Sequence, residues 1–283
     1  MNNIVACIDG SHSSRSVTLA GAWTSRVLQT PLQLLHVLEK PPAPPTQDLS
    51  GAIGMGSQEQ LLEELTALDE RRERLALEHG KHMLQEADTI ALAAGACEIQ
   101  RKQRHGDLVE TLQEMESETR LLVMGRLGED HDIEAQTIGS HLESVVRRVH
   151  RPIMVVMHEF AEPRRFMIAY DGSETAGEAL ALVAGSPLLR GLPCHLVTVG
   201  PLSEERAGQV RGARDTLVAA GFEVTSANLE GEVQAALSQY HREQAIDLMV
   251  MGAWGHSRIR QFFVGSNTTR MLSHSDITLL LLR

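Results

Sequence analysis

Residues 165–173 read RFMIAYDGS, an apolar run that ends in Asp-Gly-Ser. The same arrangement occurs near the start of the chain, where residues 3–11 read NIVACIDGS. Further along, LMVMG at 248–252 matches LLVMG at 121–125, and more glycines follow each of these runs. Features that return in the same order at a long interval indicate a duplicated structural unit.

Each copy also closes on a short apolar run, which is PIMVV at 152–156 and ITLLL at 277–281. A chain of 283 residues is long enough for two domains of ordinary size. The sequence therefore predicts two domains of one fold, at 1–158 and 159–283, joined by a polar stretch that contains Pro163.

Apolar strands alternate with helices in both copies. Strands are predicted at about 3–9, 32–38, 97–103, 120–125 and 153–157, and again at about 165–171, 193–199, 222–229, 247–252 and 277–282. Helices of the second copy are predicted at about 174–189, 203–220, 231–244 and 267–275. Continuously apolar strands are typical of a parallel sheet that helices cover on both faces. The predicted fold is α/β, with two tandem doubly wound parallel five-stranded sheets, each of strand order 3-2-1-4-5.

The two closing runs, at 152–156 and 277–281, should lie at sheet edges. An unpaired apolar edge strand favours pairing with another strand, and two such strands on one chain are at high effective concentration. We therefore expect them to pair antiparallel about a pseudo-two-fold axis, so that the two domains form an intramolecular pseudo-dimer. A further homodimer remains open.

One segment breaks the symmetry between the copies. After the second strand, the first copy inserts a proline-rich and glycine-bearing stretch at 39–57, followed by a long charged helix at about 59–95. Prolines exclude regular structure from the stretch, which predicts a mobile surface loop or, alternatively, a lid or partner-binding segment. The charge run at 69–74 indicates a solvated helix face rather than a nucleic-acid patch.

Charge and composition exclude several classes of protein. The formal net charge is −11, so the chain lacks the basic character that binding to DNA or RNA requires. No apolar stretch approaches the roughly 18–20 residues of a membrane helix, and the first residues, MNNIVACID, lack the basic region of a signal peptide. Three cysteines do not form a disulfide framework. These features predict a cytoplasmic protein that binds neither nucleic acid nor membrane.

The unusual residues of the second copy gather where such a sheet binds ligands, at the carboxyl ends of the first and fourth strands. Asp171 ends the first strand, Gly252 and Gly255 follow the fourth, and Gly265 precedes the last helix. That helix begins with hydroxyl and amide side chains and free N–H groups, which suit a phosphate; they belong to Ser266, Asn267 and Thr268. His256, Arg258 and Arg260 lie between the glycines. No Walker motif occurs, which excludes a P-loop NTPase.

The spacing Gly252-x-x-Gly255, nine residues, Gly265-Ser266 resembles the nucleotide motif of the universal stress protein (UspA) family. The repeated Asp-Gly-Ser strand and the closing strand also resemble that family, so the chain is similar to a tandem member with a Rossmann-type, HUP-like fold. The resemblance implies binding of ATP or of ADP or AMP, with Mg²⁺ accompanying ATP. It implies that Asp171 faces the ribose and base and that Val199 lines the adenine pocket. The phosphates would be held by Gly252, Gly255, Gly265, Ser266 and Asn267. His256, which lies between the glycines, is predicted to belong to the same cofactor-binding site.

The first copy departs from the motif. Ten residues separate Gly128 from Gly139, one more than in the motif, and four carboxylates occupy the segment between them. Those carboxylates would repel a triphosphate, although the acidic segment could instead hold a divalent cation. A weaker second site is therefore predicted at Asp9, Gly125, Gly128, Gly139 and Ser140.

Three functions are compatible with these observations. The first is a universal stress protein that binds an adenine nucleotide in its second domain, with a regulatory or protective role in the stress response. The second is a nucleotide-independent interaction protein whose pockets are vestigial, in which the glycines only make turns and Asp171 only caps a helix. The third is a weak ATPase. The sequence assigns no catalytic residue and no metal site.

Overall fold

The computed structural model describes residues 2–39, 55–126, 140–157, 159–253 and 266–283. Residues 2–157 contain five strands among the described residues: β1 (Asn3–Cys7), β2 (Leu32–Leu38), β3 (Ile99–His105), β4 (Thr119–Gly125) and β5 (Ile153–Val156). The helices of this half are α1 (Ser14–Leu28), α2 (Met55–Ala93), α3 (Leu108–Glu114), the short 3-10 helix η1 (Glu116–Glu118) and α4 (Ser140–Arg148).

The second half repeats the pattern. Its described strands are β6 (Phe166–Ala169), β7 (Cys194–Val199), β8 (Val224–Leu229), β9 (Leu248–Gly252) and β10 (Thr278–Leu282). Its described helices are α5 (Glu174–Gly185), α6 (Glu204–Ala219), α7 (Val233–Glu243) and α8 (Ser266–His274). The helix expected at 174–189 ends at Gly185 because Pro187 follows: the residue before it, Ser186, has φ −94° and ψ 138°, an extended conformation that a following proline favours.

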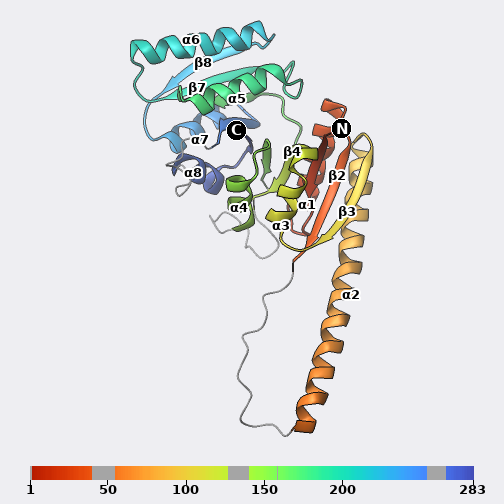
Figure 1. Ribbon diagram of the computed structural model, residues 1–283. Helices are drawn as coiled ribbons and strands as arrows, with labels where there is room; N and C mark the ends of the chain where they lie inside the picture. The colour runs from red at the N-terminus through yellow and green to blue at the C-terminus, as the bar shows by residue number, and fades with distance from the viewer. Residues whose placement is uncertain (1, 40–54, 127–139, 158, 254–265) are drawn as a thin grey trace.

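The described strands form one sheet of ten, in the order β3-β2-β1-β4-β5-β10-β9-β6-β7-β8. Within each half the order is 3-2-1-4-5 and every pairing is parallel, so the predicted α/β class is confirmed. At the centre β5 and β10 pair antiparallel, with Met154 opposite Leu280. We call this pairing the seam. It joins the two halves into one sheet that has helices on both faces (Figure 1).

Alternate residues of the seam strands enter two different hydrophobic cores, one on each face of the sheet. Met154 and Leu280 belong to one core, and Val155 and Leu279 belong to the other. Each core contains residues of both halves, for example Ile4 with Phe166 on the first face. Burial of apolar surface is therefore continuous across the seam, and it stabilises the two halves together.

Two arginines cross the seam in opposite directions. Arg126, which follows β4, donates from Nη1 to the carbonyl of Ser273 in the last turn of α8, at 2.8 Å. Arg283, which follows β10, donates to the carbonyl of Val149 just after α4, at 3.3 Å. Both cations thus approach the negative end of a helix in the other half. Burial lowers the pKa of both guanidinium groups.

Replacing Arg126 by alanine should lower the free energy of unfolding by about 1–2 kcal/mol, because a charge-assisted hydrogen bond to a helix C-terminus is lost. Urea denaturation of the full chain measures this. Arg148→Ala removes an exposed arginine from the end of α4 and serves as the control, with an expected change within about 0.5 kcal/mol. Equal effects in the two variants would contradict a role for the cross-seam bond.

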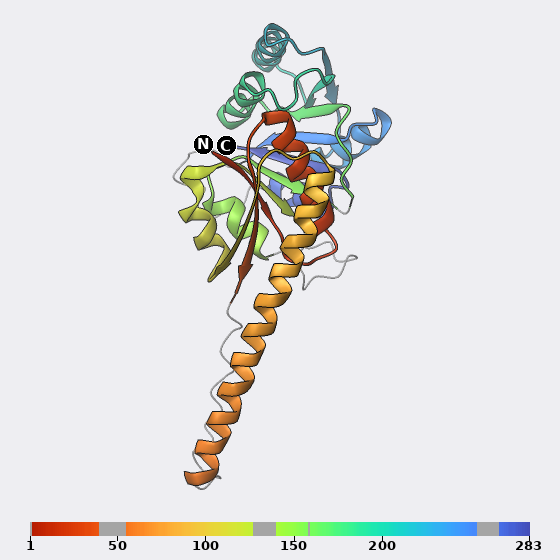
Figure 2. The same ribbon diagram turned by 90° about the vertical axis from the view of Figure 1, so that its right-hand side faces the viewer.

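Helix α2, in the place of the long charged helix expected at 59–95, has 39 residues and extends well beyond the body of the molecule (Figures 1 and 2). Its C-terminal part packs on α1, β2 and β3. Gly80 permits this packing, because a Cβ there would meet Gln103 Nε2 and lie 2.6 Å from His36 Cδ2. By contrast, each residue from 64 to 76 is exposed. The stretch expected to be a loop, 39–57, lies largely outside the described residues.

No helix among the described residues is both long enough and apolar enough to cross a membrane.

Candidate functional site

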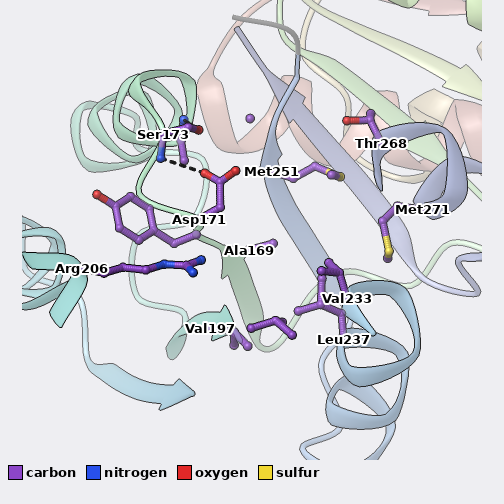
Figure 3. Close-up of a pocket in the computed structure, with 14 residues that line it drawn as sticks. Ala169, Asp171, Ser173, Val197, Arg206, Val233, Leu237, Met251, Thr268 and Met271 are labelled. Atoms are coloured by element: carbon purple, nitrogen blue, oxygen red, sulfur yellow. Dashed lines mark hydrogen bonds between the residues drawn. The ribbon is translucent and has the colours of Figure 1, made fainter. Parts of the chain in front are cut away.

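A cavity of about 260 Å³ opens at the carboxyl ends of β6, β7 and β9 (Figure 3). This is the point at which the strand order of the second half reverses, because β6 has β7 on one side and β9 on the other. The strands contribute Ala169, Val197, Val199, Met251 and Gly252 to its wall. The remaining lining residues come from loops and helices: Tyr170, Asp171, Ser173, Ala176, Arg206, Val233, Leu237, Thr268 and Met271.

Most of the cavity wall is apolar. Val197 and Met251 lie on the sheet side, and Val233 and Leu237 extend toward them from α7 (Figure 3). An apolar wall with a small number of polar groups at its edge is the usual lining of a small-molecule site. This wall suits a flat heterocycle whose faces lose water on binding.

Asp171 is the acidic group at the edge of the cavity. It lies two residues after Ala169, the last residue of β6. Its Oδ1 accepts a hydrogen bond from the backbone N–H of Ser173 at 2.9 Å. Ser173 in turn caps α5, with its Oγ accepting from the N–H of Ala176 at 3.2 Å. Among the described residues no further donor to Asp171 is found, so the exposed carboxylate keeps acceptor capacity for a ligand hydroxyl. Its negative charge also raises the pKa of Tyr170, as burial does to a greater extent.

The equivalent carboxylate of the first half is more fully engaged. Asp9 Oδ1 accepts from the N–H of Ser11 at 3.0 Å, from Ser11 Oγ at 2.6 Å and from Ser14 Oγ at 3.0 Å. Three local donors therefore compete with any ligand for one oxygen of Asp9, whereas one donor does so at Asp171. This difference favours the second half as the binding site. The reason is the number of local donors to each aspartate, which the glycine motif does not reveal.

Arg206 brings a positive charge to the cavity. Its side chain extends from the first turns of α6 toward the space between Asp171 and Val197 (Figure 3). The Nε atom is buried and has no hydrogen-bond partner among the described residues. A buried donor without a partner is costly, so a ligand that offered an acceptor to this nitrogen would be stabilised.

Sequence reasoning missed Arg206, because it followed the glycine motif and did not consider which side chains α6 directs to the site. A comparison of the two halves could have found it. Met83 of α2 approaches Gly10 in the first half, and Gln209 of α6 approaches Gly172 in the second. Arg206 lies three residues before Gln209, whereas Gly80 lies three residues before Met83. The first half therefore has a glycine where the second half has this arginine.

The structure brings together three of the residues expected in the stronger site, Asp171, Val199 and Gly252, and adds Thr268 from the first turn of α8. Ser266 and Asn267 begin that helix, so its N-terminus opens beside the cavity. Gly255, His256 and Gly265 lie outside the described residues.

For the weaker site, Asp9 follows β1, Gly125 ends β4 and Ser140 begins α4. Gly128, Gly139 and the acidic segment between them lie outside the described residues.

The packing of the fold itself requires glycine at position 252. A Cβ at this position would lie 2.9 Å from the carbonyl oxygen of Thr175 and 3.1 Å from the backbone nitrogen of Ala176. These are backbone atoms of α5, which cannot move aside as a flexible side chain could. Glycine is therefore needed where α5 crosses the end of β9, whether or not a ligand is present.

Within the described residues, no group of three or more histidine, cysteine or acidic side chains is placed to hold a metal ion. The thiols are also poorly suited to chemistry at the site. Burial raises the pKa of Cys194 to about 12 and that of Cys7 still further, so both remain protonated.

The sequence model of the universal stress protein family matches residues 1–157 and 200–283. A universal stress protein of Synechocystis is 31% identical over 287 aligned positions, which cover 100% of both chains. Among solved structures, a universal stress protein from Archaeoglobus fulgidus covers 100% of this chain and 98% of its own, with a TM-score of 0.74 and 19% identity. A putative universal stress protein from Pseudomonas aeruginosa covers 100% and 93%, with a TM-score of 0.62 and 16% identity. The chain therefore belongs to the universal stress protein family.

Proposed function

We propose that this chain binds one adenine nucleotide, in the cavity of its second half. The observation that carries the proposal is the position of Arg206 in the cavity: its buried Nε has no hydrogen-bond partner in the described parts of the chain, and Asp171 has acceptor capacity to spare in the same cavity. A ligand that satisfies both must present acceptors and hydroxyl donors around an apolar body. A nucleoside phosphate has all three.

The proposed orientation follows from where each kind of group lies. The base would pack against Val197, Val199 and Leu237, and the ribose hydroxyls would donate to Asp171. The cavity has about the volume of a nucleoside rather than of a whole nucleotide, so the phosphates would extend out of it toward the N-terminus of α8. A helix N-terminus stabilises an anion through its free N–H groups and its dipole.

The rest of the proposal concerns the whole chain. Residues 1–158 would form one domain and residues 159–283 the other, with the seam holding them as an intramolecular pseudo-dimer. Nucleotide binding would serve a regulatory or protective role in the cytoplasm during stress. Any hydrolysis of ATP would be slow, so that binding rather than turnover would be the main activity.

Isothermal titration calorimetry of the full chain with ATP should give one site per chain. Asp171→Asn should weaken ATP binding by roughly 10-fold or more, because a hydrogen bond to a charged group is worth about 1.5–3 kcal/mol. Asp9→Asn is the matched control, since it makes the same change at the equivalent position of the other half, and it should leave the affinity unchanged.

Two equal sites, or equal effects of the two substitutions, would contradict binding confined to the second half. Mass spectrometry of the small molecules released when the purified chain is denatured provides an independent measurement. A chain that releases no nucleotide and gives no heat with ATP, ADP or AMP would favour the nucleotide-independent interaction protein.

A further inference from the structure

The projecting part of α2 has an exposed apolar stripe. Leu65, Leu68 and Leu75 are 48%, 62% and 58% exposed, and they are three of the most exposed large apolar side chains among the described residues. Their neighbours between 64 and 76 are exposed as well, so this half of the helix rests on no other part of the described chain. A helical segment without tertiary packing is only marginally stable in water. A partner that covered the stripe would therefore stabilise the projection.

The spacing of the stripe is that of a coiled coil. Leu65, Leu68, Arg72 and Leu75 follow one another at intervals of three, four and three residues, which places them at successive a and d positions of a heptad. Arg72 is the polar member, and its aliphatic stem can lie against an apolar neighbour while its charge stays in water. Glu64 and Arg71 then occupy the g positions that border the stripe.

We propose that the projecting half of α2 is an interface with a second copy of this chain, in which the two α2 helices pack antiparallel. In this alignment Leu65 of one copy packs against Leu68 of the other, and the same contact occurs a second time by symmetry. Antiparallel helices bring g positions opposite g positions, so Glu64 of each copy faces Arg71 of the other. Two apolar layers are thus bordered by two opposite-charge pairs.

A parallel alignment of the same helices is unfavourable. It would place Arg72 against its own copy in the core of the interface, and it would bring Glu64 opposite Asp69, which is at an e position. Both contacts join like charges. The charges around the stripe therefore select the antiparallel orientation.

The antiparallel pair also leaves room for the two folded bodies. With a rise of 1.5 Å per residue, the points at which the two helices enter their bodies, near residue 77, would lie roughly 30 Å apart along the paired helices. The bodies would therefore lie at opposite ends of the pair, as the free length of α2 in Figure 2 permits.

Other routes to self-association by strand pairing are less open. The edges of β5 and β10 are already used within the chain, where they form the seam. The strands at the two ends of the sheet are β3 and β8. β3 reads IQRKQRH, and such a charged edge strand disfavours pairing with another sheet. β8, the strand at the other end, reads VTSANL and carries no charge, so the stripe of α2 is preferred for its heptad spacing and charge pairs and not because every sheet edge is blocked.

Sedimentation analysis of the full chain should show a mass that rises from 31.0 kDa toward twice that value as the concentration increases. Leu65→Ser with Leu68→Ser should weaken the association by tenfold or more, because both apolar layers are lost. Leu92→Ser is the matched control, since Leu92 is 70% exposed on the same helix but outside the stripe. A mass that stays at 31.0 kDa at all concentrations overturns the proposal, and the stripe would then contact a different protein.

Charge reversal tests the orientation. Glu64→Lys and Arg71→Glu should each weaken the dimer several-fold, because each places like charges opposite each other. The two changes together restore opposite charges and should return the affinity to that of the unchanged chain. Glu70→Lys makes the same charge change on the outer face of the helix and should have little effect. Stronger association with Glu64→Lys alone would indicate a parallel pair and overturn the antiparallel interface.

Discussion

Replacing Arg206 by alanine should lower the affinity of the chain for ATP by about 10- to 100-fold, which corresponds to the roughly 1.5–3 kcal/mol of a hydrogen bond to a charged group. In the unchanged protein the Nε of Arg206 is buried, and no residue that the structure describes offers it an acceptor. Binding of an acceptor would therefore relieve an existing cost as well as form a new bond. The alanine variant loses both contributions, and calorimetric titration measures the sum.

Arg211→Ala is the control, because Arg211 lies on the same helix and is exposed. It should leave the affinity for ATP within about twofold of the unchanged chain. Arg206→Lys keeps the positive charge but has no Nε, so its affinity for ATP should lie between that of Arg206→Ala and that of Arg211→Ala. If the alanine variant binds ATP as well as the unchanged chain does, Arg206 does not contact the nucleotide.

The stability of the Arg206→Ala variant separates binding from folding. The cap of α6 uses the backbone N–H of Arg206, which donates to Ser203 Oγ at 3.2 Å, and the substitution leaves that bond in place. The free protein should therefore unfold at the same urea concentration or at a slightly higher one, because the substitution removes a buried donor for which the described chain holds no acceptor. A large loss of stability would mean that the arginine is structural.

The sequence was sufficient for the parts of this molecule that local patterns determine. Continuously apolar strands and the repeated Asp-Gly-Ser predicted the parallel sheets and placed Asp171 at the carboxyl end of β6, where the cavity lies. Strand order followed from the alternation of strands and helices. These features depend on residues close together in the chain and on general rules of topology.

The parts that depend on distant packing could not be predicted in the same way. Arg206 is one of 26 lysines and arginines in the sequence, and only the packing of α6 against α5 and β8 brings it to the cavity. The three local donors to Asp9 belong to serines of the turn that follows β1. The sequence shows these serines, but only the distances in the structure show that they occupy the carboxylate of Asp9. The glycine at 252 was assigned to phosphate binding, although its contact with α5 is sufficient to require it.

Replacing Leu280 by aspartate should destabilise both halves of the chain, by more than about 4 kcal/mol. Leu280 is 2% exposed on β10, where it stands opposite Met154 in the seam and belongs to a core shared by the two halves. Arg120 lines the same hollow as Leu280, but its Nη1 already donates to the carbonyl of Leu28 and to Thr30 Oγ1. Burying a charge in an apolar core is among the most costly single changes. Leu92→Asp introduces the same charge at a position that is 70% exposed and should change the stability little.

The distribution of the damage between the halves is the informative measurement. Because each core runs across the seam, hydrogen exchange in the Leu280→Asp variant should accelerate in β4 and β5 of the first half as well as in β9 and β10. Two halves that folded independently would confine the acceleration to the second half, since the substitution lies in β10. Full protection of β5 alongside exchange throughout β10 would therefore show that the seam adds little to the stability of the first half, whatever the total loss of stability.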